Sequence, residues 1–405
     1  MSSLDWLDSL QGSGIRPGLG RIRALLRKLG RPHRKYPSVI VAGTNGKGST
    51  SATLASILHA AGYRTGLYTS PHLVDIRERW RISEEPIDPD LLRESIEALR
   101  AAGEAIGITP TYFEALTILA FVAFDRANID VAVLEVGMGG RLDATNVVRP
   151  VAALITPIGF DHMEYLGNTI RMIAREKAGV IHRGTIVLTS NRDPVVLEVL
   201  RRRAAKFGND FHVVEPHHGP IDTPLAGAFQ RENVTLAMCA AEELRERFPR
   251  ITPEAIRKGV ATTKWRGRLE RIDYRDKRIW IDGCHNAHAV LAVRPFIEES
   301  IDRPRLLVFG IMSDKDVDEV VASFFPLFDR IIVCEPYPPR SADAQSLAAK
   351  AAAMGIHAVA EKDPRAALQR ALESGERSIF VGGSLYLAGA AIEFFDALRK
   401  ERNAG

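Results

Sequence analysis

The sequence has few cysteines, no long apolar run and no large excess of one charge, and each absence excludes a class of protein. Its three cysteines, Cys239, Cys284 and Cys334, are widely separated, which argues against a disulfide framework or a structural zinc site and fits a reducing compartment. No segment approaches the roughly 18 apolar residues of a membrane span, and the first residues lack the basic and apolar run of a signal peptide. The formal charge of +4 gives no reason to expect a nucleic acid or a membrane as partner. We therefore expect a soluble cytoplasmic protein.

Short runs rich in valine and isoleucine alternate with longer segments of helical period. This alternation predicts an α/β fold with mostly parallel strands, and the length of the chain favours two or three domains. The first strand is expected at 38–42, and a helix at 49–61 after a glycine-rich turn. The pattern restarts near residue 265, so we place one domain at 1–265 and a smaller α/β domain at 266–405. Further strands are expected at 64–68, 129–136, 151–156, 185–189, 279–282, 306–309, 330–333 and 378–381, and further helices at 91–106, 112–126 and 232–247.

The residues between the first strand and the first helix, GTNGKGST at 43–50, have the composition of a phosphate-binding loop. Glycines let several backbone N–H groups point at one anion, and a helix N-terminus adds about half a positive charge. Lys47 would supply a cation for the β- and γ-phosphates, and the hydroxyl of Ser49 would reach a Mg²⁺ ion that bridges them. Because Gly43 precedes Gly46 by only three residues, the usual spacing is not matched, and a turn that merely caps a helix is the alternative.

Further motifs follow in order along the chain. They are SPHL at 70–73 with RER at 77–79, TYFE at 111–114, LEVGMGGRLDATN at 134–146, TPIGFDHMEYLGNTIRMIAREKAGVI at 156–181, WRGRLE at 265–270 and DGCHN at 282–286. Together with the phosphate loop, these motifs resemble those of the folylpolyglutamate synthase / dihydrofolate synthase family of the Mur ligase superfamily. The resemblance extends over nearly the whole chain.

This resemblance implies a P-loop-type, Mur ligase-like central domain that binds ATP and the folate, and a Rossmann-like C-terminal ligase domain. It also implies an ATP-dependent amide ligase in which a carboxylate becomes an acyl phosphate and the amine of L-glutamate then displaces phosphate. The acid would be dihydropteroate, tetrahydrofolate or both. The alternatives are a folylpolyglutamate synthase without dihydropteroate activity, a Mur-type enzyme acting on a UDP-sugar peptide, and a P-loop ATP-binding regulator without ligase activity. We expect no redox cofactor, and a monomer.

The resemblance assigns ATP and metal contacts to particular residues. For ATP these are Thr44, Asn45, Gly46, Lys47, Gly48, Ser49, Asn233, Arg268, Asp282 and His285. For Mg²⁺, expected as two ions, they are Ser49, Ser70, Glu135 and His162, with Lys177 added if it is carbamylated. The expected catalytic residues are Lys47, Lys177 and His162.

For three of these residues the sequence leaves a plainer interpretation open. Glu135 ends an apolar strand, where a carboxylate is normally paired or bound to a metal, so an ion pair with Arg141 is its alternative. His162 follows another strand and could be a hydrogen-bonded loop histidine, and Lys177 could be a helix lysine paired with an acidic neighbour.

A pterin ring needs a flat pocket with apolar walls and a few polar groups. Tyr112 and Phe113, at the start of a helix, would supply walls, and Asp143 would accept hydrogen bonds from pterin N–H groups. The resemblance implies a substrate site formed by Thr111, Tyr112, Phe113, Glu114, Leu142, Asp143 and Ala144. Packing in the core is the alternative for the two aromatic side chains.

Overall fold

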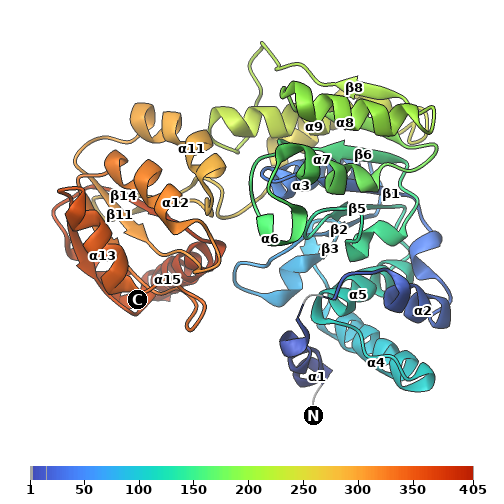
Figure 1. The fold of residues 1–405 in the computed structure, drawn as a ribbon, viewed down its shortest axis with the longest axis horizontal. Helices are drawn as coiled ribbons and strands as arrows, with labels where there is room; N and C mark the ends of the chain where they lie inside the picture. The colour runs from blue at the N-terminus through green and yellow to red at the C-terminus, as the bar shows by residue number, and fades with distance from the viewer. Residues whose placement is uncertain (1–2, 15, 405) are drawn as a thin grey trace. The chain divides into compact units, whose positions relative to one another are not determined.

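The computed structural model describes residues 3–14 and 16–404, and these form two compact units (Figure 1). The first unit contains the chain up to Pro71, Arg77–Pro224 and Arg231–Lys264, and the second contains His72–Ile76, Leu225–Gln230 and the chain from Trp265 onward. Each unit is built on a mostly parallel sheet, which confirms the predicted fold class. No helix in the described ranges is long and apolar enough to cross a membrane.

Among the described residues, the first unit has an eight-stranded sheet with the order β4-β3-β2-β5-β1-β6-β7-β8. The strands are β1 (Ser38–Ala42), β2 (Thr65–Tyr68), β3 (Trp80–Ile82), β4 (Glu85–Pro86), β5 (Val131–Glu135), β6 (Ala152–Ile155), β7 (Ile186–Thr189) and β8 (Phe211–Val213). The two pairings of β3, with β2 and with β4, are antiparallel, and the other strand pairings described for this sheet are parallel. The central strands β2, β5, β1 and β6 are buried along their whole length, as is usual for parallel strands covered by helices.

The helices of this part of the chain are α1 (Ser3–Ser9), η1 (Gln11–Ser13), α2 (Gly20–Lys28), η2 (Pro32–Arg34), α3 (Lys47–Ala60), η3 (Ile76–Arg79), α4 (Pro89–Ile106), α5 (Tyr112–Arg126), η4 (Ala144–Val147), α6 (Met163–Leu166), α7 (Ile170–Lys177), η5 (Ala178–Val180), α8 (Pro194–Ala205), α9 (Ala228–Glu243) and α10 (Pro253–Thr262). Helix α3 packs against β1, β2, β5 and α10, so nearly all of it is buried. A Cβ atom at Gly259 of α10 would lie 2.4 Å from the Cα atom of Ile57, so this close helix approach requires glycine.

The strand order marks the edge of this sheet where a ligand is expected. From β1 the chain crosses to β2 on one side, whereas from β6 it continues to β7 on the other. In open α/β sheets, ligands bind at the carboxyl ends of the strands where such connections diverge. The segments after β1 and β6 are joined there: the N–H of Thr44 donates to the carbonyl of Pro157 at 3.0 Å, and its hydroxyl donates to the carbonyl of Gly159 at 3.0 Å.

In the second unit, the described residues form a six-stranded sheet with the order β13-β12-β11-β14-β10-β9, of which only β9 is antiparallel to its neighbour. Its elements are β9 (Glu270–Tyr274), β10 (Lys277–Ile281), α11 (Ala287–Ser300), β11 (Arg305–Phe309), α12 (Val317–Phe324), η6 (Phe325–Leu327), β12 (Arg330–Val333), α13 (Ala344–Ala353), β13 (His357–Ala360), α14 (Pro364–Glu373), β14 (Ser378–Gly382) and α15 (Leu385–Ala404). Alternate residues of β11 enter two separate apolar clusters: Leu307 and Phe309 enter one, Leu306 and Val308 the other. The sheet is therefore covered on both faces.

Some bounds differ from those predicted. Helix α3 begins at Lys47 rather than residue 49, because Gly46, with a φ of +88°, is its N-cap. Helix α9 covers 228–243 rather than 232–247. Short or partly exposed strands such as β8 and β13 were not predicted, because neither carries a continuous buried apolar run.

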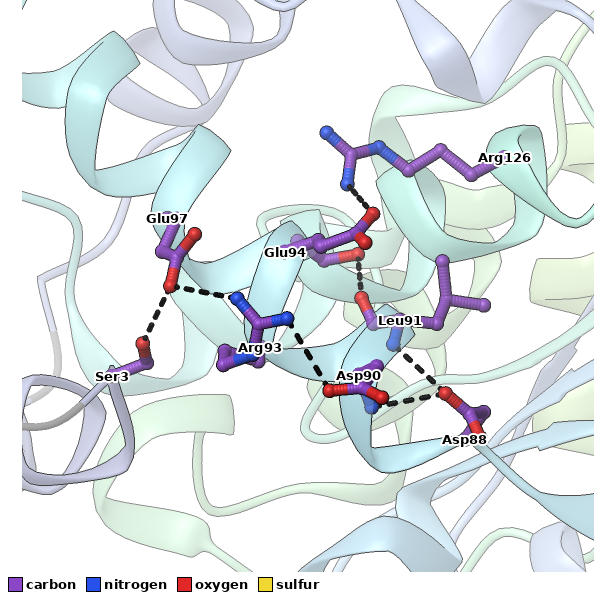
Figure 2. A network of polar contacts seen from close by, with 9 residues as sticks. Ser3, Asp88, Asp90, Leu91, Arg93, Glu94, Glu97 and Arg126 are labelled. Atoms are coloured by element: carbon purple, nitrogen blue, oxygen red, sulfur yellow. Dashed lines mark hydrogen bonds and ion pairs between the residues drawn. The ribbon is translucent and has the colours of Figure 1, made fainter.

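Helix α4 begins with a side-chain cap (Figure 2). A carboxylate oxygen of Asp88 accepts hydrogen bonds from the N–H groups of Asp90 at 2.9 Å and Leu91 at 3.1 Å. On the exposed surface beside it, Arg93 pairs with Asp90 and Glu97 at 3.3 Å each. The cap satisfies two helix-terminal donors, whereas the ion pairs lie in solvent.

We expect Asp88→Ala to lower the free energy of unfolding by about 1 kcal/mol, because two N–H groups at the start of α4 lose their acceptor. Urea unfolding followed by circular dichroism measures the change. Arg93→Ala removes only exposed ion pairs and serves as the control, with a smaller expected effect. An equal loss in the two variants would show that the cap contributes nothing of its own.

Candidate active site

The loop between β1 and α3 is shaped by two glycines. Gly43 has a φ of +148° and Gly46 a φ of +88°. An added Cβ atom would lie 1.8 Å from the hydroxyl oxygen of Thr156 at Gly43, and 2.1 Å from the side-chain oxygen of Asn233 at Gly46. No side chain fits at either position, so the backbone itself lies against these neighbours. A loop of this kind can direct its N–H groups at a phosphate.

Two of the residues predicted to contact ATP meet at this loop, although they are far apart in the sequence. Asn233, from α9, is buried against Gly46, and its carbonyl accepts a hydrogen bond from the hydroxyl of Thr50 at 3.3 Å. The ammonium group of Lys47 donates to the carbonyl of Thr44 at 2.8 Å. Ser49 is buried in the first turn of α3.

Lys177, the last residue of α7, is a buried amine rather than a surface lysine. It is only 4% exposed, and its Nζ atom donates to the carbonyl of Gly43 at 2.7 Å. Burial and the nearby Lys47 cation lower the pKa of Lys177 to about 7, although Asp161 and Asp143 act in the opposite direction. Near neutral pH a large fraction of this amine is therefore unprotonated, and an unprotonated amine is a nucleophile.

Glu135 and Ser70 follow neighbouring parallel strands and contact each other. Glu135 is the last residue of β5 and is buried, and its Oε2 atom accepts a hydrogen bond from the backbone N–H of Ser70 at 3.2 Å. Arg141 instead forms an ion pair with Glu176 at 3.0 Å, so the Glu135–Arg141 pair that the sequence left open is absent from the described residues. The Glu135 carboxylate is thus held at the carboxyl end of the sheet, close to Ser70, two residues beyond the end of β2.

His162 lies in the segment that follows β6. It is the N-cap of the short helix α6 and has a φ of +50°, an uncommon conformation for a residue with a side chain. Its N–H donates to the carboxylate of Asp161 at 2.9 Å, and its Nε2 atom lies 3.9 Å from the same oxygen. Within the described ranges, no three His, Cys, Asp or Glu side chains gather as a metal site.

A pocket of about 400 Å³ lies beside these strand ends. Of the predicted substrate residues, it is lined by Thr111, Phe113, Glu114, Leu142, Asp143 and Ala144. Tyr112 is not among the lining residues, whereas Ser70 is. Arg79 and Tyr165 also line it; no contact was predicted for either, although both belong to the quoted motifs. Arg16 lines it as well, from the segment IRPGL at 15–19, which resembles the N-terminal substrate segment of the family.

One wall of the pocket is the ring of Phe113 against a glycine backbone. A Cβ atom at Gly137 would lie 2.3 Å from the Cζ atom of Phe113, so the ring and the chain at 137 are in close contact. The lining as a whole is mostly apolar and also includes Leu142 and Ala144. Such a space suits a flat aromatic group.

Two of the three acidic residues that line the pocket, Glu114 and Asp143, are differently engaged. In Glu114, Oε2 accepts from the N–H of Thr111 at 2.8 Å and from Arg21 at 3.1 Å, whereas Oε1 is buried and lacks a hydrogen-bond partner among the described residues. In Asp143, both oxygens accept hydrogen bonds, from Met138 at 3.0 Å and from Thr145 at 2.9 and 2.6 Å. Burial raises the pKa of Asp143 despite these bonds.

The three remaining predicted residues lie together in the second unit. Asp282 is buried, and its oxygens accept from the N–H groups of Leu269 at 2.9 Å and Cys284 at 2.8 Å. Burial raises the pKa of Asp282, and the Arg268 cation partly offsets this effect. The Nδ1 atom of His285 contacts the carbonyl of Gly283 at 2.8 Å.

Arg266 lies two residues before Arg268, but its guanidinium group has different partners. It forms ion pairs with Glu270 at 2.8 Å and with Asp396 at 2.6 Å. Arg268 instead lies near Asp282 and donates to the carbonyl of Gly267 at 2.9 Å. Of the two arginines, Arg268 is therefore the one associated with the predicted ATP residues.

The fold and the site define an ATP-dependent ligase of the Mur type. The family model of the Mur ligase middle domain matches residues 41–213, and that of the Mur ligase, glutamate ligase domain matches residues 267–385. The dihydrofolate synthase/folylpolyglutamate synthase of Bacillus subtilis is 36% identical over 78% of this chain and 80% of its own length. The folylpolyglutamate synthase of Lacticaseibacillus casei is 34% identical over 91% of this chain and 92% of its own. The chain belongs to the dihydrofolate synthase/folylpolyglutamate synthase family, as its motifs predicted.

Solved structures agree over nearly the whole chain. The Mycobacterium tuberculosis folylpolyglutamate synthase complexed with ADP and AMPPCP has a TM-score of 0.87 and 34% identity, covering 97% of this chain and 98% of its own. The E. coli FolC structure in complex with DHPP and ADP has a TM-score of 0.86 and 29% identity, covering 98% of this chain and 99% of its own. Membership of a ligase family removes the alternative of a P-loop regulator without ligase activity.

Proposed function

We propose that this ligase joins L-glutamate to dihydropteroate, to tetrahydrofolate or to both, using ATP and Mg²⁺. The observation that carries the proposal is the link between the phosphate loop and the apolar pocket. Lys177 contacts Gly43 of the loop, and its amine is close enough to Asp143, a pocket residue, for that carboxylate to influence its pKa. A flat acid in the pocket would therefore present its carboxylate near a nucleotide held by the loop.

In this proposal the phosphate loop and its neighbours neutralise ATP. Thr44, Asn45, Gly46, Gly48 and Ser49 would surround the phosphates, as would Lys47 and Asn233. Lys47 would offset charge on the transferred phosphoryl group, which is the main work of a phosphoryl-transfer site. In the second unit, Arg268 would balance phosphate charge, Asp282 would accept hydrogen bonds from the ribose hydroxyls, and His285 would pack on the adenine base of ATP.

The residues predicted to hold Mg²⁺ fit this ion on the chemistry of their donors, and two of them, Glu135 and Ser70, are in contact. Mg²⁺ prefers oxygen ligands and usually keeps several waters or phosphate oxygens. Glu135 would supply a carboxylate, and Ser70 and Ser49 would supply hydroxyls, while His162 adds an imidazole. When bound, the two ions would neutralise the triphosphate and polarise the phosphoryl group.

Lys177 would complete this set as a carbamate. Its unprotonated amine would attack CO₂, forming an N–C bond and releasing one proton, so an amine becomes an anionic oxygen ligand. The lowered pKa near 7 supports this step, because a fully protonated ammonium group has no lone pair to react. Burial beside Lys47 would then favour the anionic product over the original cation.

The decisive test is an assay of the purified protein with dihydropteroate, L-glutamate and Mg·ATP, and in parallel with tetrahydrofolate. We expect glutamate-dependent ADP release with dihydropteroate. Elongation of tetrahydrofolate alone would favour a folylpolyglutamate synthase without dihydropteroate activity. No amide with either acid, while a UDP-sugar peptide is extended, would overturn the proposal. With a carboxylate labelled with ¹⁸O, one labelled oxygen should appear in the released phosphate if an acyl phosphate forms.

We expect Gly137→Ala to raise KM for the pterin substrate about tenfold, because the new methyl group displaces the ring of Phe113 from the pocket wall. KM for ATP should change little, since the phosphate loop is untouched. Steady-state kinetics with each substrate varied in turn measures both. Gly375→Ala, where no atom lies within 4 Å of the added carbon, is the control. An equal rise in both KM values would assign Gly137 a general structural role.

We further propose that the protein acts in the cytoplasm as a monomer, with neither a nucleic acid nor a membrane as partner. Its small net charge of +4 supports the second point. Light scattering of the purified protein with and without ATP tests the oligomeric state.

A further inference from the structure

A second, strongly basic hollow lies between helices α7 and α8 of the first unit. Its volume is about 370 Å³. Among the described residues that line it, six side chains are cationic, and one, Glu198, is a carboxylate. The cations are Arg141, Arg171, Arg175, Arg202, Arg203 and Lys206. None of them was assigned to ATP, to the metal or to the substrate.

Three of the cationic side chains that line this hollow make contacts within the protein. Arg171 pairs with Glu198 at 2.8 Å, linking the two helices. Arg203 donates from Nε to the carbonyl of Ile181 at 3.2 Å. Arg141 is tied back by Glu176 at 3.0 Å. Arg203, which contacts a backbone carbonyl, is the best positioned of the three, whereas the partly exposed ion pairs of Arg171 and Arg141 orient those guanidinium groups only weakly.

The three remaining cationic side chains contribute to the net positive charge of the hollow. Arg175, Arg202 and Lys206 are exposed, and the Glu198 carboxylate, itself paired with Arg171, is influenced by both Arg175 and Arg202. Basic residues near a helix C-terminus are common, because they offset about half a negative charge there. Arg175, Arg202 and Arg203 lie in last turns, but three arginines and their three cationic neighbours far exceed what two helix ends require.

We propose that this hollow binds a compact polyanion that carries two or more clustered phosphate or carboxylate groups. Guanidinium groups bind such groups through paired, charge-assisted hydrogen bonds. The volume suits a small molecule rather than a polymer. Two sources share this chemistry: phosphoanhydrides, and chains of γ-linked glutamate residues with one carboxylate for each residue. This inference does not depend on the proposed ligase reaction.

The hollow is distinct from the substrate pocket but adjoins the same backbone. Arg141 lines the hollow, whereas its neighbours Gly140 and Leu142 line the substrate pocket. In the same way Arg175 faces the hollow and Glu176 faces the pocket, and α7 then ends at Lys177. An anion in the hollow would thus contact the helix that carries the buried lysine, and yet would not occupy the reaction site.

The test uses isothermal titration of the full chain with two probes, pyrophosphate and tri-γ-L-glutamate, in buffer without Mg²⁺. Lys47→Ala is present throughout, so that pyrophosphate is not held by the phosphate loop. We expect at least one probe to bind, and Arg175→Ala/Arg202→Ala to weaken it at least about tenfold, because charge-assisted hydrogen bonds are lost. Binding of pyrophosphate alone identifies phosphoanhydrides as the ligand class, and binding of triglutamate alone identifies polycarboxylates.

Two further variants keep the outcome clear. Arg201→Ala/Arg100→Ala removes the same charge from exposed arginines of the first unit outside the hollow, and should weaken binding less than about twofold. Glu198→Gln removes the single carboxylate and should tighten binding, a gain that misfolding does not produce. No binding of either probe at millimolar concentration, or equal losses in the two double variants, would overturn the proposal. Failure of the ligase assays would leave these affinities unchanged.

Discussion

Lys47→Ala is expected to lower kcat for amide formation at least about a hundredfold, the cost of removing one preorganised group that stabilises charge in a transition state. The side chain lies in the phosphate loop and does not enter the apolar core, so the fold should persist. Single-turnover assays with Mg·ATP and circular dichroism measure the two quantities.

The matched control for this variant is Lys35→Ala. Lys35 is an exposed lysine of the same unit, paired with Asp125 at 2.6 Å away from the loop. We expect its kcat to stay within about twofold of the parent value, because exposed pairs contribute little. Turnover of Lys47→Ala close to that of the control would exclude the loop as the site of phosphoryl transfer.

Lys177→Met is expected to abolish ligation and yet to stabilise the fold. In the folded chain the pKa of Lys177 is about 7, against an ordinary value of 10.5. Below pH 7 the ammonium group is charged in both states, so the full cost of burying the charge, on the order of 5 kcal/mol, opposes folding. Between pH 7 and pH 10.5 the unfolded chain binds more protons than the folded one, so stability rises with pH and the cost disappears.

Urea unfolding at several pH values, in buffer depleted of CO₂, measures this effect. At pH 6 the variant should exceed the parent by a few kcal/mol, on the order of 3 after loss of the hydrogen bond to Gly43. The difference should shrink as the pH rises to 10. Lys35→Met, an exposed lysine, should show neither change. A constant difference across this range would mean that Lys177 does not titrate near neutral pH.

The loss of activity in Lys177→Met has a separate check. If Lys177 acts as a carbamate, short added carboxylates should restore part of the activity of Lys177→Met by supplying the missing oxygens. The unsubstituted parent protein should also gain about 44 mass units reversibly with CO₂, the mass of the added group, whereas the variant should not. Full loss without rescue, together with an unmodified mass under CO₂, would leave Lys177 only a positioning role through Gly43.

Local sequence was sufficient where the deciding interactions are short in range. The run at 38–42 is a strand because its five residues are all apolar or small and are buried on both faces. Helix α5 begins at 112 because Thr111 and Glu114 form a reciprocal cap, which depends on residues three apart. The glycines at 43 and 46 could likewise be interpreted from the sequence, since a positive φ is a property of one residue and its neighbours.

Partners that depend on packing could not be predicted in this way. Arg141 binds Glu176 rather than Glu135, because the turn after β5 packs against the end of α7 and against η5, where a Cβ atom at Gly179 would lie 2.4 Å from the Cα of Arg141. Strand β8 was missed because only its pairing with β7 holds it in the sheet. Arg79 belongs to the RER motif, for which no contact was predicted. It lines the pocket because the pairing of β2 with β3 brings the residue before β3 to this side of the sheet.

The linear motifs by themselves determined the chemistry that this protein can perform. They identified the phosphate loop, the carboxylate at a strand end and the signature of a glutamate ligase. Folding added what no linear pattern holds, namely that Asn233 fits against Gly46, and that Lys177 is buried beside Lys47. Burial and long-range proximity arise only when distant segments share one interior, and they change the proton affinity of an ordinary lysine. The same packing brings six cationic side chains from separate segments together around one hollow between α7 and α8.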